Sequence, residues 1–173
     1  MREKLTCGLG LYLMADRAIL PTEAITESRL RVDIEPVAVF DYRNRSEFIA
    51  ALEKAIAIGN PAAPNPASAE LEPDADGFPA FKKPAGLKYS GLSTWDELER
   101  KSILATVRYY PSGFLLEIFG RAKNGKWSEE AALELRLTLE SGLNGVVEAI
   151  LEHLKTRKDL PGLMLDFNQS RTA

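Results

Sequence analysis

Alternation of apolar and polar positions predicts β-strands in the first forty residues. Leu9, Leu11 and Leu13 alternate with smaller or amphipathic residues, which is the period of a half-buried strand. The stretch "RLRVDIEPVAVFD" is apolar at every second residue until Pro36, where the phase changes. Because proline cannot donate a ladder hydrogen bond, we expect a strand with a bulge or an edge position there.

The second half of the chain predicts a three-strand meander. The runs "ILATVRYY" and "GFLLEIF" flank Pro111 and Ser112, and Asn124-Gly125 is a strong two-residue hairpin signal. The composition of "EEAALELRLTLE" favours a helix, but its leucines fall at every second position. We therefore expect a strand from Glu130 to Glu140, because hydrophobic period outweighs composition in a half-buried element.

Two amphipathic helices accompany the predicted strands. "RSEFIAALEKAIAIG" places its apolar residues on one helical face, with Ser46 as the expected cap and Gly59 as the expected end. "LNGVVEAILEHLK" has the same helical spacing. The predicted fold class is α+β, with an antiparallel sheet made of the three-strand meander plus at least one further strand, and helices packed on one face.

Residues 60–86 form a long connection with six of the ten prolines and no sustained apolar period. We expect residues 1–173 to form a single globular domain that carries this Pro/Ala-rich loop. Four acids lie within it: Glu70, Glu72, Asp74 and Asp76. Counted from Glu72, the spacing of Glu72, Asp74 and Asp76 is similar to the opening of a calcium-binding loop, but the twelfth position is Lys83 instead of a carboxylate, so we expect no calcium site.

The stretch "STWDELERK" combines a helix start with an acidic, aromatic surface. Thr94 and Glu97 have the spacing of a capping box. Trp95 can pack inward while Asp96, Glu97 and Glu99 complement the positive end of the helix dipole. Alternatively, Trp95 can be an aromatic anchor for a partner, with these carboxylates around it. The first interpretation is favoured, and the second stays open.

Composition and charge exclude several classes of protein. Lys and Arg number 22 against 25 Asp and Glu, giving a net charge of −3, which argues against nucleic acid as the main partner. One cysteine cannot form an internal disulfide, so a reducing, cytoplasmic location is expected. The start has the basic and apolar parts of a signal peptide without a cleavage site, and no run is long enough for a membrane-spanning helix.

No catalytic motif is present in the sequence. The single histidine, His153, lies beside the apolar stripe of its helix, Cys7 has no CxxC partner, and there is no phosphate-binding loop. We expect no cofactor, no metal site and no catalytic residue, and lean toward a protein that is not an enzyme. The alternative is a small enzyme or ligand-binding domain built from scattered Asp, Glu, Arg and Tyr, such as Arg108, Tyr109, Tyr110 and Arg121.

The segment "GLSTWDELERKSILATVRYYPSGFLLEIF" resembles the immunity proteins of bacterial contact-dependent growth inhibition systems. Some further similarity lies in "RLRVDIEPVAVFDYRNRSEFIAAL". The resemblance implies a cytoplasmic, non-enzymatic protein that binds and neutralises one cognate toxin domain, and it assigns no catalytic residue. A basic toxin domain would gain association rate and specificity from an acidic inhibitor. The candidate partner-binding residues are Trp95, Asp96, Glu97, Glu99, Glu70, Glu72, Asp74 and Asp76.

Overall fold

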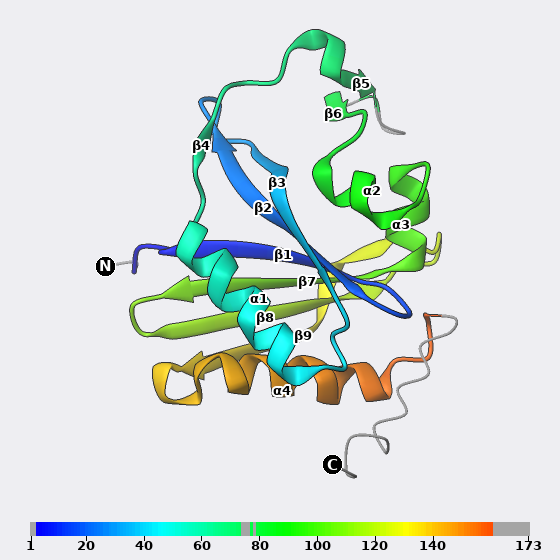
Figure 1. The fold of residues 1–173 in the computed structure, drawn as a ribbon. Helices are drawn as coiled ribbons and strands as arrows, with labels where there is room; N and C mark the ends of the chain where they lie inside the picture. Colours follow the sequence, from blue (N-terminus) through cyan, green and yellow to red (C-terminus); the bar gives the residue numbers. More distant parts are fainter. Residues whose placement is uncertain (1–2, 74–76, 78, 161–173) are drawn as a thin grey trace.

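The computed structural model describes residues 3–73, 77 and 79–160, and an antiparallel sheet is its main element (Figure 1). The strand order is β3-β2-β1-β7-β8-β9, and β4 pairs with β2 in parallel. The strands are β1 (Cys7–Leu13), β2 (Ala18–Thr26), β3 (Arg31–Phe40), β4 (Ala62–Ala63), β7 (Ile103–Tyr110), β8 (Gly113–Arg121) and β9 (Trp127–Thr138). A separate small sheet pairs β5 (Leu71–Pro73) with β6 (Pro79–Phe81). The predicted α+β class is confirmed.

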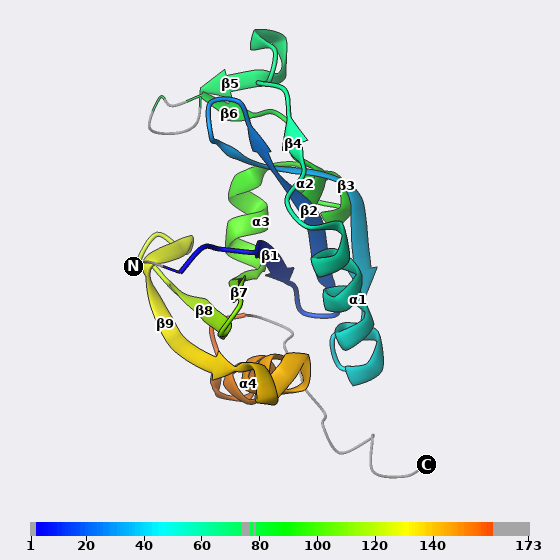
Figure 2. The same cartoon turned by 90° about the vertical axis from the view of Figure 1, so that its left-hand side faces the viewer.

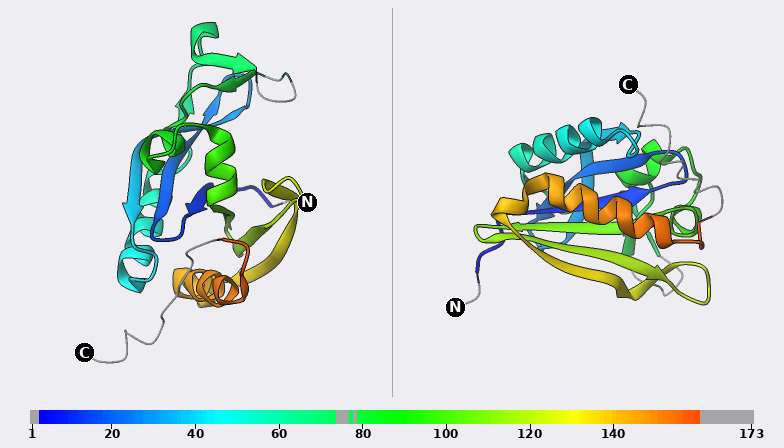
Figure 3. Two further views of the ribbon diagram at one scale, coloured as in Figure 1. Left: turned by 90° about the vertical axis from the view of Figure 1, so that its right-hand side faces the viewer. Right: turned by 90° about the horizontal axis from the view of Figure 1, so that it is seen from below.

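Two long helices cover one face of the main sheet. They are α1 (Arg45–Ile58) and α4 (Gly142–Thr156), and they lie side by side in the view from below (Figure 3, right). Leu11 of β1, Phe48 of α1 and Ile150 of α4 are all fully buried in the shared core. The two amphipathic helices predicted from the sequence therefore bury their apolar sides as expected, and both pack against the same face of the main sheet.

Two short helices lie on the opposite face, near one end of the sheet. They are α2 (Ala85–Ser90) and α3 (Trp95–Lys101), and Figure 2 shows α3 and α4 on opposite sides of β1. A second, smaller core of Tyr12, Met14, Ile19, Leu87 and Leu98 joins them to the sheet. Two short 3₁₀ turns, Ser68–Glu70 and Leu139–Ser141, complete the described elements. Within the described ranges, no helix has the length and apolarity to cross a membrane.

The strands with clear period-two patterns form as predicted. β9 contains the leucine-rich segment, and Leu133 and Leu137 pack against the main core. β3 is an edge strand, and its register shifts between Pro21–Val37 and Thr22–Ile34, which leaves Glu35 and the cis-bonded Pro36 as the bulge. Alternation identified the two faces of β9 correctly, whereas Leu30 and Val39, which the pattern around β3 counted as apolar positions, are 56% and 45% exposed.

Three sequence-based expectations need correction. Asn44, not Ser46, is the N-cap of α1, since its side chain accepts a hydrogen bond from the Glu47 amide. The pattern missed β2, which carries Pro21 at its centre, and also the short helix α2. Part of the connection at residues 60–86 is structured, because β4 extends the main sheet and β5 pairs with β6.

One asparagine bridges a split in the main sheet. β1 pairs with β2 only at Tyr12–Ile19 and Leu13–Ala18, after which β2 diverges steeply from β1 (Figure 1). At the open end, Asn60 Oδ1 accepts from the Gly8 amide at 2.7 Å. Its Nδ2 donates to the carbonyls of Gly8 and Glu23, both at 2.8 Å. One side chain therefore satisfies backbone groups that a continuous ladder would pair.

We expect Asn60→Ala to lower the free energy of unfolding by about 2–3 kcal/mol, because three backbone groups lose their partner at about 1 kcal/mol each. Urea unfolding followed by circular dichroism measures this change. The control is Asn65→Ala, an exposed asparagine that bonds Ser28 and should cost at most about 1 kcal/mol. Equal losses in the two variants would contradict a special role for Asn60.

Candidate functional site

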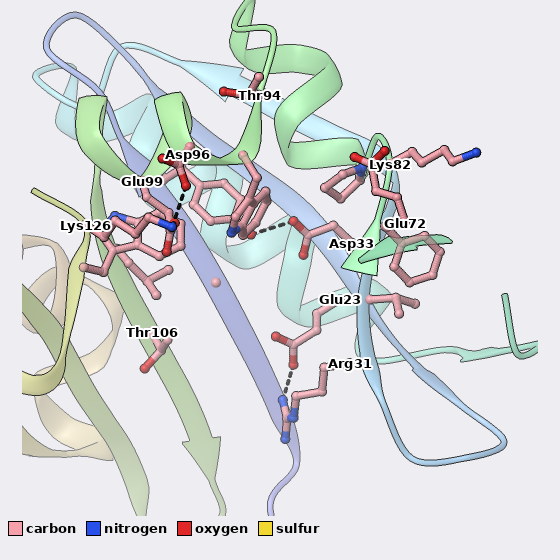
Figure 4. A pocket seen from close by; sticks show the side chains of 18 of the residues that line it. Glu23, Arg31, Asp33, Glu72, Lys82, Thr94, Asp96, Glu99, Thr106 and Lys126 are labelled. Carbon is pink, nitrogen blue, oxygen red and sulfur yellow. Dashed lines mark hydrogen bonds and ion pairs between the residues drawn. The ribbon is translucent and has the colours of Figure 1, made fainter. Parts of the chain in front are cut away.

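A cavity of about 800 Å³ lies on the α2 and α3 face, in the angle between the diverging strands (Figure 4). Strand β1 forms its floor, β2 and β3 form one wall, and β7, β9 and α3 form the other. Residues of β5 and β6 also reach its edge. We call this cavity the cleft. Its walls come from segments that are far apart in the sequence.

The floor of the cleft has little side-chain volume because glycines alternate with apolar residues in β1. Leu9 and Leu11 face the α1 and α4 core, so Gly10 and Tyr12 face the opposite side, where they line the cleft. A Cβ atom on Gly10 would have a single neighbour within 4 Å, the Glu23 Oε2 atom at 4.0 Å. Space above Gly10 is therefore open, and packing alone does not require glycine there.

Three aromatic rings close one end of the cleft. Tyr12 stacks on Trp127 with ring centroids 5.6 Å apart, and Trp95 meets both rings edge-on at 5.8 and 5.7 Å. The Trp127 indole nitrogen donates to the Ser102 carbonyl at 3.1 Å. Edge-to-face and offset contacts of this kind are the favoured aromatic geometries. The cluster is a rigid wall that joins β1, α3 and β9.

Asp33 is the carboxylate most shielded by this wall. The Tyr12 hydroxyl donates to Asp33 Oδ2 at 2.6 Å, and the Gly86 amide also donates to this carboxylate. The pKa of Asp33 is raised to about 6, chiefly by burial and also by the nearby Glu23 charge, against the lowering effect of these hydrogen bonds. Among the described residues, no basic side chain forms an ion pair with Asp33.

The remaining charges in the cleft are partly paired. Glu23 forms an ion pair with Arg31, and Lys126 lies 2.5 Å from Asp96 and 3.5 Å from Glu99. The described lining includes six carboxylates, from Glu23, Asp33, Glu72, Asp96, Glu99 and Glu129, against the three cations Arg31, Lys82 and Lys126. The cleft is therefore acidic after its internal pairs are taken into account.

This arrangement suits recognition of a cationic group. Carboxylates that lack a cation partner and aromatic faces both attract ammonium and guanidinium groups. Within the described part of the chain, no three His, Cys, Asp or Glu side chains are grouped to hold a metal ion. Cys7 is buried in the main core, where burial raises the pKa of its thiol, so it is not an activated nucleophile.

The structure brings four of the candidate partner-binding residues to the cleft: Trp95, Asp96, Glu99 and Glu72. Glu97 instead accepts from the Ser93 and Thr94 amides, completing the predicted capping box. Glu70 lies outside the cleft lining and accepts from the Ala67 amide. Asp74 and Asp76 lie outside the described residues.

Sequence reasoning missed most of the cleft. Tyr12, Glu23, Asp33 and Lys126 come from elements that meet only in the folded chain. The available signal was "GLGLYL", because glycines at alternate strand positions mark a face where something can approach closely.

The arginines and tyrosines that motivated the scattered-site alternative lie outside the described cleft lining. Arg121 donates to the carbonyls of Glu99, Ser102 and Gly125 and pairs with Asp159. Arg108 pairs with Glu117 at 3.0 Å. Tyr109 stacks on Phe114 and packs against the main core. These contacts hold the fold together.

Comparison with known proteins gives no family. No protein-family model, curated protein or solved structure matches the chain. The function must therefore be argued from the cleft itself.

The pKa of Asp33 leads to a prediction for stability against pH. With the carboxyl pKa near 6 in the folded protein and 3.8 as its ordinary value, the native state holds this proton more tightly than the unfolded chain. Stability therefore falls as pH rises from about 4 to 6. Asp33→Asn removes this titration, so relative to the parent the variant should gain about 2 kcal/mol of unfolding free energy between pH 4 and pH 7.

Urea unfolding of parent and variant at pH 4, 5.5 and 7 measures this difference, in which contributions of other titrating groups cancel. Asp41→Asn is the matched control, because the guanidinium of Arg43 holds the pKa of Asp41 below its ordinary value. Because its lowered pKa places this titration below about pH 3.8, the difference between Asp41→Asn and the parent should stay nearly constant between pH 4 and pH 7. A flat profile for Asp33→Asn would show that Asp33 ionises freely in the fold.

Proposed function

We propose that the protein is a non-catalytic binding protein that recognises a basic surface of a protein partner through the cleft. In this role it acts as an immunity protein that neutralises a bacterial toxin domain. One observation carries the proposal: an aromatic-walled cavity of about 800 Å³ has six carboxylates and three cations in its described lining. A concave surface of this charge attracts a basic partner and repels an acidic one.

The location of the resemblance supports this role. The segment from Gly91 to Phe119 resembles immunity proteins, and it contributes Trp95, Asp96, Glu99 and Thr106 to the cleft. Toxins that cut nucleic acid have basic active sites that bind phosphates. An inhibitor that presents carboxylates to such a site competes with the substrate by charge and gains association rate. We place this action in the cytoplasm, where the toxin would otherwise act.

A second candidate function is a small enzyme or ligand-binding domain. It is favoured by the volume of the cleft, which is in the range of small-molecule sites, and by Asp33, whose raised pKa suits a general acid or base. No activated nucleophile accompanies Asp33 among the described lining residues. The three aromatic rings at the end of the cleft contact one another, and Tyr12 donates to Asp33.

The test of the proposed function is co-purification of the tagged protein from its native host, followed by reconstitution with the partner. We expect a complex that is stable at micromolar concentration and whose partner has a basic contact surface. The double variant Glu72→Gln/Glu129→Gln should slow association several-fold at low salt and little at high salt, since salt screens charges over about 8–10 Å. Surface-capture kinetics at two ionic strengths measure this.

The control for the association rate is Glu53→Gln/Glu148→Gln, which changes the same charge on α1 and α4, away from the cleft. It should leave the association rate unchanged. A larger effect of this control than of the cleft variant would place the interface on the helices. Absence of any stable complex at micromolar concentration would refute the proposed function.

A further inference from the structure

The floor of the cleft holds an unfilled space beside two carboxylates. Above Gly10, a Cβ atom would have no neighbour closer than 4.0 Å, and that neighbour is the Glu23 carboxylate. Figure 4 shows Glu23 and Arg31 on one side of the cleft and Thr106 on the other. The space is therefore bounded by polar groups along its sides, while the ring of Tyr12 lies at its end.

The charges at this place do not balance. Glu23 and Asp33 are directly opposite each other on β2 and β3, so their side chains share one face of the sheet. Like charges in this position repel, and Glu23 indeed raises the pKa of Asp33. Among the described residues, Arg31 pairs with Glu23 and with no other carboxylate. Within this part of the chain the two carboxylates share one cation, and the donors to Asp33 are the neutral groups of Tyr12 and Gly86.

We infer that this space holds the guanidinium of one arginine side chain of the protein partner, seated over Gly10 between Glu23 and Asp33; this rests on the proposed function. A guanidinium is planar, weakly hydrated and able to donate to two carboxylates at once, and it stacks on aromatic rings. The two carboxylates offer these donor contacts together, while the Tyr12 ring, which is only 6% exposed, bounds the space at one end. The absence of a side chain at Gly10 leaves room for the arginine stem.

Binding should depend on the ionisation of Asp33. The groups that face it are Tyr12 from β1, Glu23 from β2, Arg31 from its own strand and the Gly86 amide from α2. Lys88 of α2 is engaged by Glu35 on the outer side of β3. Because the pKa of Asp33 is about 6 in the free protein, its carboxyl is mostly protonated at pH 5. A bound cation is therefore stabilised less by Asp33 at pH 5 than at pH 7.5.

The test titrates the protein with N-acetyl-argininamide, with N-acetyl-citrullinamide as the neutral isostere and N-acetyl-lysinamide as the other cation. Both tryptophans of the chain, Trp95 and Trp127, line the cleft, so intrinsic fluorescence reports on it without a label. We expect the arginine amide to bind most tightly and several-fold more weakly at pH 5 than at pH 7.5. Asp33→Asn should weaken it about tenfold or more, which corresponds to 1.4 kcal/mol.

Gly10→Val is the second variant, because it fills the space without removing a charge and should abolish arginine binding. Glu148→Gln on α4 is the control and should bind as the parent does. Equal binding of the citrulline or lysine amide, or unchanged binding in a folded Gly10→Val protein, would overturn the inference. If the partner complex persists in Asp33→Asn and Gly10→Val, the proposed function stands and only the arginine site is wrong. If the parent protein itself forms no partner complex, both the proposed function and the arginine site are refuted.

Discussion

The side chain of Asn60 holds the two halves of the sheet at the angle on which the cleft depends. It bonds both backbone groups of Gly8 and the carbonyl of Glu23, so β1 and β2 can separate without leaving these groups unpaired. Gly59 ends α1 just before it, and the Pro61 carbonyl accepts from Ile25 just after it. The asparagine is thus fixed from both sides. A continuous β1–β2 ladder would close the angle and bring Glu23 against the floor.

Strand β1 serves two different environments because its side chains alternate. One face supplies leucines to the core that α1 and α4 cover, and the other supplies Gly10 and Tyr12 to the cleft. The two requirements do not compete, since no residue belongs to both faces. Stability and recognition do compete at Asp33, because a carboxylate held near buried rings opposes folding when it ionises. The main core has to offset this cost, as is common where a binding site needs a shielded charge.

Local patterns predicted the elements but not the cleft. The leucine period of β9, the capping box of α3 and the bulge at Pro36 depend on neighbours in sequence, and all three formed as expected. β2 was missed because Pro21 interrupts a run that is buried on both faces and so has weak alternation. Asp33 and Glu23 become a pair only through the register of β2 with β3. No spacing in a single sequence shows that register.

The sequence allowed two interpretations of Trp95 in α3, an inward-packing connector and part of a binding surface, and the two do not exclude each other. Trp95 packs against Tyr12 and Trp127, as a structural connector would, and that packing forms the wall of the cleft. Since its ring is held by two others, a partner can lie against this wall but cannot draw Trp95 out without breaking the smaller core. The adjacent Asp96 and Glu99 already form ion pairs with Lys126. They therefore contribute to the negative electrostatic potential of the cleft more than to direct contacts with a bound cation. In the proposed role, selectivity for a cation then depends on Asp33, the shielded carboxylate that the described residues leave without a cation partner.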